Sequence, residues 1–159
     1  MTIAENVRRP LGTALAAGVV VFYAVAMSAA TWVFLNTGSQ ILPGVLVWIG
    51  WGLYPGVAAT VAIRSRSEAS VTAIAVLVPA LIQAPFNEPG RYLLTAVVVP
   101  LAIAAGTFFG IWVAGALMRR PGRGRTVVGF LAGGAVGLVL TFVLCLPVLL
   151  LVSATTAAI

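Results

Sequence analysis

The side chains from which enzymes build most active sites are nearly absent from this chain. Acidic groups are confined to Glu5, Glu68 and Glu88, all nine basic residues are arginine, and the 159 residues include no histidine, lysine or aspartate. The chain therefore lacks the residues for a Schiff-base lysine, a histidine-ligated haem, a histidine-containing zinc site or a histidine-based catalytic triad. We expect a protein that is not an enzyme and that binds no cofactor or metal.

The one thiol does not change this expectation. Cys145 lies deep in an apolar run, and a single cysteine can form neither an intrachain disulfide nor a cysteine cluster. Its simplest interpretation is a small buried hydrophobic side chain.

The composition is that of a membrane protein. Hydrophobic residues make up 62% of the chain and charged residues only 8%, against about 25% charged residues in soluble domains. The formal net charge of +6 would suggest nucleic acid as a partner in a soluble protein, but the arginines lie at the ends of apolar runs. We therefore expect a lipid bilayer as the surroundings and no nucleic-acid partner.

The predicted fold is all-α, a polytopic transmembrane helical bundle that forms a single domain over residues 1–159. Apolar runs of about 17–25 residues can cross a bilayer as helices. Five such runs are predicted to span, at residues 11–35, 41–63, 69–86, 92–118 and 127–152. The third run is short and carries two prolines and a glutamine, so a bundle of four spans is the alternative.

The arginines predict the orientation of the spans, because basic residues in short loops accumulate on the cytoplasmic side. With five spans and a cytoplasmic N-terminus, eight of the nine arginines fall inside, only Arg91 falls outside, and the C-terminus lies outside. The exclusive use of arginine suggests a GC-rich prokaryotic genome. We therefore predict a multi-pass protein of a prokaryotic plasma (inner) membrane.

The third run has the strongest candidates for a pathway or ligand contact. Prolines remove backbone donors, and the carbonyls freed in this way are tolerated where they line a cavity. An amide lies between the two prolines and polar residues follow them, so the candidate set is Pro79, Gln83, Pro85, Asn87, Glu88 and Arg91. The competing interpretation is a helix end followed by a solvated turn.

Small residues recur every four positions in three of the runs and so line one helical face, which lets helix backbones approach closely. These faces contain Gly52 and Gly56; Gly106, Gly110 and Ala114; and Gly129, Gly133 and Gly137. They are predicted to pack helices together, either within this bundle or against another subunit.

Two further groups of residues have two interpretations each. A basic strip follows the fourth run and is explained by topology alone or by contact with lipid headgroup phosphates, through Arg119, Arg120, Arg123 and Arg125. Aromatic residues of the second run, Trp48, Trp51 and Tyr54, are explained by interface anchoring and core packing or by a slot for a carotenoid or quinone.

The leading functional hypothesis is a non-enzymatic subunit or an accessory or assembly protein of a membrane complex, in contact with further copies of itself or with a larger membrane protein. The alternative is a component of a small transporter or channel, with the proline-containing third span beside the pathway. The alternative is weakened because the predicted hydrophobic cores contain no ionisable residue, whereas ion pathways usually place one there.

Overall fold

The computed structural model describes residues 3–36, 41–65, 67–83, 93–120, 122 and 124–156. This part of the chain folds into five helices and contains no strand, so the prediction of an all-helical fold is confirmed. The helices are α1 (Ile3–Asn36), α2 (Ile41–Ser65), α3 (Glu68–Gln83), α4 (Leu93–Met118) and α5 (Arg125–Thr156).

Four of these helices are long and apolar enough to cross a membrane. Their apolar segments are Gly12–Phe34, Pro43–Ser65, Val97–Met118 and Arg125–Pro147. At a rise of about 1.5 Å per residue, each is about 33 Å long or slightly more, which matches a hydrocarbon core of about 30 Å. They indicate a membrane-embedded protein.

The third helix is shorter than the other four. α3 has 16 residues, which gives a length of about 24 Å. The predicted run 69–86 continues beyond the last residue of α3, and residues 84–86 lie outside the described part of the chain. The helix by itself is therefore shorter than a typical hydrocarbon core.

The first and last helices of the chain, α1 and α5, extend beyond the predicted spans. α1 begins at Ile3 instead of residue 11, and α5 ends at Thr156 instead of residue 152. Apolar runs mark the part of a helix that suits lipid, whereas backbone hydrogen bonds can continue past the run in polar residues. The bounds of α2 and α4 agree with the sequence prediction to within two residues.

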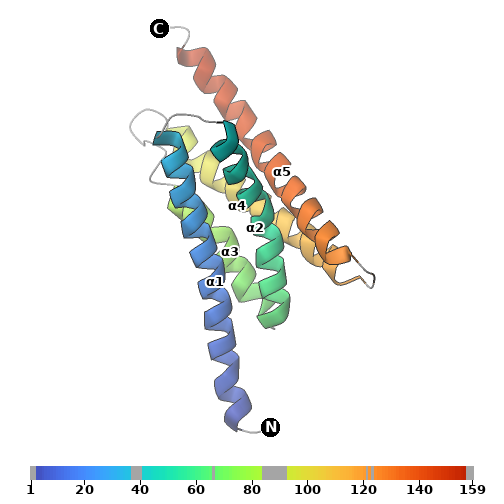
Figure 1. Ribbon diagram of the computed structural model, residues 1–159. Helices are drawn as coiled ribbons and strands as arrows, with labels where there is room; N and C mark the ends of the chain where they lie inside the picture. Colours follow the sequence, from blue (N-terminus) through green and yellow to red (C-terminus); the bar gives the residue numbers. More distant parts are fainter. Residues whose placement is uncertain are drawn as a thin grey trace.

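Consecutive helices run in opposite directions, and α2 lies in the middle of the bundle (Figure 1). α2 contacts each of the other four helices, while α4 and α5 share the most extensive contact. The start of α1, the α2–α3 junction and the α4–α5 turn lie toward the same end of the molecule (Figure 1). In that turn Gly122 and Gly124 have φ values of 147° and 81°, which favour glycine.

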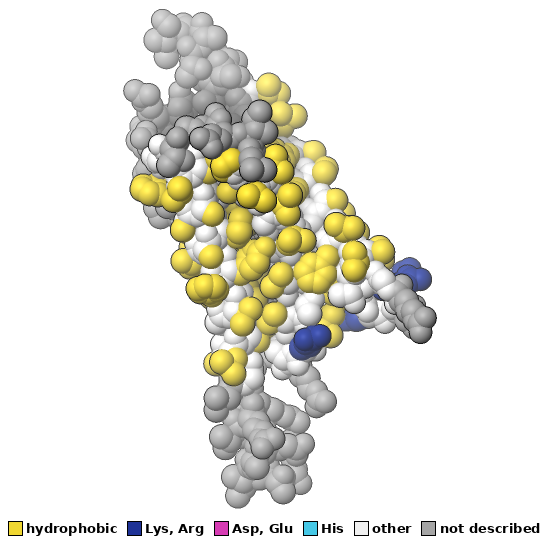
Figure 2. Space-filling view, in the orientation of Figure 1, with side chains coloured by type: hydrophobic (Ala, Val, Ile, Leu, Met, Phe, Trp, Pro, Cys, Tyr) yellow, Lys and Arg dark blue, Asp and Glu magenta, His cyan; other side chains and the backbone are white. Residues whose placement is uncertain are grey.

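The side chains inside the bundle are mostly small, and the large aliphatic side chains face outward. On α1 the buried residues Ala16, Val20, Ala24 and Ser28 recur every four positions and form one stripe. Phe22, Leu131 and many other large hydrophobic side chains are exposed, and hydrophobic atoms cover much of the visible face (Figure 2). Lipid tails are as apolar as leucine, so bundles in membranes associate through close packing of small residues.

Prolines are not peculiar to the third run. Pro55, Pro79, Pro100 and Pro147 lie inside α2, α3, α4 and α5, respectively. A proline inside a helix therefore does not by itself distinguish α3 as the functional helix.

Candidate functional site

The backbones of α4 and α5 approach each other closely at the glycines that the sequence identified. A Cβ atom at Gly133 would lie 2.6 Å from the Gly110 carbonyl oxygen and 2.7 Å from the Ala114 Cβ. A Cβ atom at Gly106 would lie 2.5 Å from the Gly137 carbonyl oxygen. No side chain fits at these positions unless the two helices move apart.

The second helix packs against the same pair of helices. Gly110 and Gly137 both face Pro55 of α2, at 3.0 Å and 3.4 Å from the nearest ring carbon to a Cβ built on each glycine. Gly52 meets the backbone of α5 at Gly134, where an added Cβ would overlap the Gly52 carbonyl oxygen. α2, α4 and α5 therefore meet along glycine and proline surfaces.

The remaining glycines of the predicted faces also contact neighbouring helices of this chain. Gly129 faces Met118 and the Ala114 carbonyl oxygen, and Gly56 faces the ring of Phe130. The structure thus places these faces against one another inside the bundle, where they are not free for another subunit. Sequence reasoning missed Gly134. Its position directly after Gly133, a member of a predicted packing face, could have indicated that it also lies at a helix contact.

An aromatic cluster fastens α1 and α3 to α2. The Tyr54 hydroxyl donates to the Ala75 carbonyl oxygen at 2.9 Å, and the Tyr23 hydroxyl donates to the Gly50 carbonyl oxygen at 2.7 Å. The Tyr54 ring centroid lies 5.6 Å from that of Tyr23 and 5.8 Å from that of Trp51. These tyrosines satisfy their polar groups within the protein, so their role in the structure is packing.

A cavity of about 360 Å³ lies beside this cluster, between α1, α2, α4 and α5, and all three aromatic residues considered for a slot line it. Its walls are Thr31, Phe34, Val47, Trp48, Trp51, Tyr54, Pro55, Val99, Ile103, Thr107, Gly137, Leu138, Thr141, Phe142 and Cys145. The Trp51 indole N–H donates to the Thr31 hydroxyl, and the Thr141 hydroxyl donates to the Gly137 carbonyl oxygen. The cavity therefore offers a mainly apolar surface.

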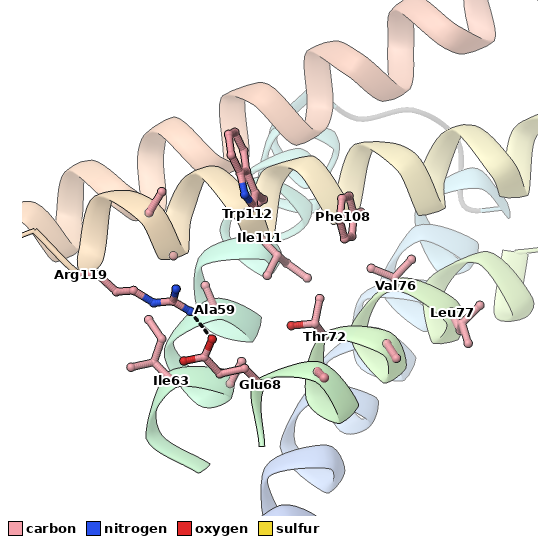
Figure 3. Close-up of a pocket in the computed structure, with 15 residues that line it drawn as sticks. Ala59, Ile63, Glu68, Thr72, Val76, Leu77, Phe108, Ile111, Trp112 and Arg119 are labelled. Atoms are coloured by element: carbon pink, nitrogen blue, oxygen red, sulfur yellow. Dashed lines mark hydrogen bonds and ion pairs between the residues drawn. The ribbon is translucent and has the colours of Figure 1, made fainter. Parts of the chain in front are cut away.

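A larger cavity of about 590 Å³ lies between α2, α3 and α4 and has charge at one end only (Figure 3). We call it the α2–α3–α4 groove. It is lined by Ala59, Ala62, Ile63, Glu68, Ala69, Thr72, Ala73, Val76, Leu77, Phe108, Ile111, Trp112, Gly115, Ala116 and Arg119. The Arg119 guanidinium donates to the Glu68 carboxylate at the charged end.

This ion pair joins α3 to the end of α4 at the surface. The Arg119 and Glu68 side chains are 58% and 48% exposed, and exposed pairs stabilise proteins by at most about 1 kcal/mol.

In detergent without phospholipid, we expect Arg119→Gln to lower the melting temperature slightly at low salt and not at all at high salt. Arg120→Gln, one residue further on, is the matched control and should change neither value; an unscreened or larger loss would mean that the pair carries the α3–α4 contact.

The candidate pathway residues lie largely outside the described structure. Pro79 is buried within α3, and Gln83 is the last residue of that helix. The Gln83 side chain and the residues Pro85, Asn87, Glu88 and Arg91 lie outside the description. Their proposed clustering stays a prediction.

The basic strip after α4 is described in part. Arg119 is paired with Glu68, Arg120 is exposed and Arg125 is half-buried at the start of α5, while Arg123 lies outside the described residues. Glu68 is the residue of this charged end that sequence reasoning missed. Its place in the first turn of α3, after Arg64 and Arg66, gave no sign of a partner 51 residues further on.

No group of three or more histidine, cysteine, aspartate or glutamate side chains that could hold a metal occurs among the described residues. Comparison of the chain with protein-family models, curated proteins and solved structures gives no match. The apolar helices and the packing of small residues between them are compatible with an integral membrane protein, a helical bundle.

Proposed function

We propose that the chain is a non-enzymatic subunit or an accessory or assembly protein of a complex in a prokaryotic plasma membrane. The observation that carries the proposal is the placement of charge. The arginine and glutamate side chains that the structure describes lie at helix ends, at Arg64, Glu68, Arg119, Arg120 and Arg125. Proton relays and ion pathways usually place ionisable groups at membrane depth, so association is a better-supported role than transport.

We further propose five spans, with the N-terminus inside and the C-terminus outside. The Arg119–Glu68 ion pair brings the start of α3 and the end of α4 to the same level. α4 has 26 residues, enough to cross the membrane by itself. If α4 crosses, the chain between Glu68 and the start of α4 crosses as well, which supports a third crossing that α3 begins. The arginines at the α2–α3 and α4–α5 junctions then share the cytoplasmic side.

The subunit role is tested by chemical cross-linking in intact cells at native expression, followed by purification in mild detergent and quantitative mass spectrometry. We expect a second membrane protein, or further copies of this chain, in near-equimolar amount. For the matched control, the chain carries an affinity tag, and its lysate is mixed before purification with isotope-labelled membranes from cells that lack the tagged chain. A protein that binds only after detergent extraction then carries the label. A monomer without an unlabelled partner would contradict the subunit role.

The second candidate is a component of a small transporter or channel with α3 beside the pathway. Its support is that the shortest helix forms one wall of the 590 Å³ groove. Reconstituted vesicles containing the protein should then release a trapped small solute faster than vesicles with Gly115→Leu, which places a side chain in the groove. Equal release from the two kinds of vesicle would contradict this candidate.

A further inference from the structure

The α2–α3–α4 groove has the anatomy of a phospholipid site. Its charged end lies at the helix ends, beside the junction of α2 and α3, and its apolar walls continue along α3 and α4 (Figure 3). On α3 the groove runs from Glu68 to Leu77, a distance of about 14 Å along the helix. Half of a hydrocarbon core is about 15 Å thick. The groove therefore has the depth of one bilayer leaflet.

The walls leave room for an acyl chain. Many of the lining residues are alanine, and Gly115 in the α4 wall is buried, yet a Cβ atom built there would meet no atom within 4 Å. This contrasts with Gly110 and Gly133, whose added Cβ atoms would collide with a neighbouring helix. Gly115 therefore borders space instead of a packed partner.

The two charges at the end of the groove distinguish between headgroups. A guanidinium has five N–H donors and a carboxylate has two acceptor oxygens, and the ion pair joins Nη2 of Arg119 to Oε2 of Glu68. Both side chains are about half exposed, so each remains accessible to a headgroup. An anionic headgroup would meet the Arg119 charge but would be repelled by Glu68, whereas a phosphate carrying an ammonium group complements both.

We propose that the groove holds one phosphatidylethanolamine molecule, with an acyl chain between α3 and α4, the phosphate on Arg119 and the ammonium on Glu68. Charge-assisted hydrogen bonds from the guanidinium to the phosphate and from the ammonium to the carboxylate fix the headgroup. The proposal requires that the bundle is embedded in a membrane, but it does not require the subunit role. The two can fail separately, because one is tested by the lipid that the chain retains and the other by the protein that co-purifies with it.

The test reconstitutes the full chain into vesicles of equal amounts of phosphatidylethanolamine and phosphatidylglycerol, extracts it into mild detergent and counts the lipids retained per chain by mass spectrometry. We expect the wild type to retain phosphatidylethanolamine with a preference of about tenfold, equivalent to about 1.4 kcal/mol. Glu68→Gln should abolish this preference by removing the acceptor for the ammonium. Equal retention of the two lipids by the wild type, or an unchanged preference in Glu68→Gln, would overturn the headgroup assignment.

Variants of the groove wall test the acyl-chain position. Gly115→Leu should fill the space and reduce the retained lipid severalfold, while Gly18→Leu should retain as much as the wild type, because Gly18 also has open space around it but lies on the exposed side of α1. Ala116→Leu, at an exposed position of the same wall, repeats the test if Gly115→Leu fails to fold. Wild-type retention in a folded wall variant would overturn the proposal.

Discussion

Gly133→Leu is expected to destabilise the bundle by about 3 kcal/mol, the upper part of the usual range for overpacking a close contact. A Cβ atom at this position would lie 2.6 Å from the Gly110 carbonyl oxygen and 3.3 Å from the Ala114 Cα. Both are backbone atoms, so no rotation of a flexible side chain can relieve the overlap. α4 and α5 must separate, and their extensive contact is lost.

The matched control is Gly18→Leu, which introduces the same side chain into a helix where an added Cβ meets no atom within 4 Å. Thermal unfolding in detergent, followed by intrinsic tryptophan fluorescence, should show a large loss for Gly133→Leu and little change for Gly18→Leu. If the two variants have the same melting temperature, α4 and α5 are not in contact at Gly133.

Tyr54→Ala has the second-largest expected effect. Tyr54 is 1% exposed and is the largest of the fully buried side chains described. Replacing a buried aromatic ring by a methyl group leaves a cavity and typically costs about 3 kcal/mol. The ring lies between Tyr23 and Trp51, and its hydroxyl reaches the Ala75 carbonyl oxygen, so the variant loosens α1 and α3 as well as α2.

Tyr54→Phe separates packing from hydrogen bonding, because it keeps the ring and removes only the hydroxyl. Interhelical hydrogen bonds in membranes contribute about 0.6 kcal/mol on average, so this variant should lose far less stability than Tyr54→Ala. Unfolding in the same detergent measures both. A loss in Tyr54→Phe as large as that in Tyr54→Ala would mean that the hydrogen bond, and not the ring, holds the three helices together.

The five helices of the described residues could be located from the sequence, although not the start of α1 or the end of α5. Apolar runs of the right length, separated by charged or turn residues, have few other folds available. The glycines that bring α4 and α5 together could also be predicted, since a repeat of four places them on one face. Which helix each face meets was not predictable. Gly52 and Gly134 lie far apart in the sequence, and only the crossing of α2 and α5 brings them into contact.

The charged end of the groove was not predictable for the same reason. Arg119 belongs to a strip of four arginines that the sequence explains by topology alone or by contact with lipid headgroups, and Glu68 had no assigned role. Their ion pair joins residues 51 positions apart. It depends on α3 and α4 lying side by side, and a chain of short loops does not specify this arrangement. The sequence instead places the candidate pathway in the third run because of its prolines, although α2, α4 and α5 contain prolines too.

The most direct test of the proposed five-span arrangement is a pair of reporter fusions in a bacterial host, one after Ile159 and one within the α4–α5 turn after Gly122. Alkaline phosphatase is active only outside the cytoplasm and a fluorescent protein folds well only inside it, so each site is fused to each reporter. Five spans predict phosphatase activity without fluorescence at Ile159, and fluorescence without phosphatase activity at Gly122. Fluorescence without phosphatase activity at Ile159 would contradict the five-span arrangement.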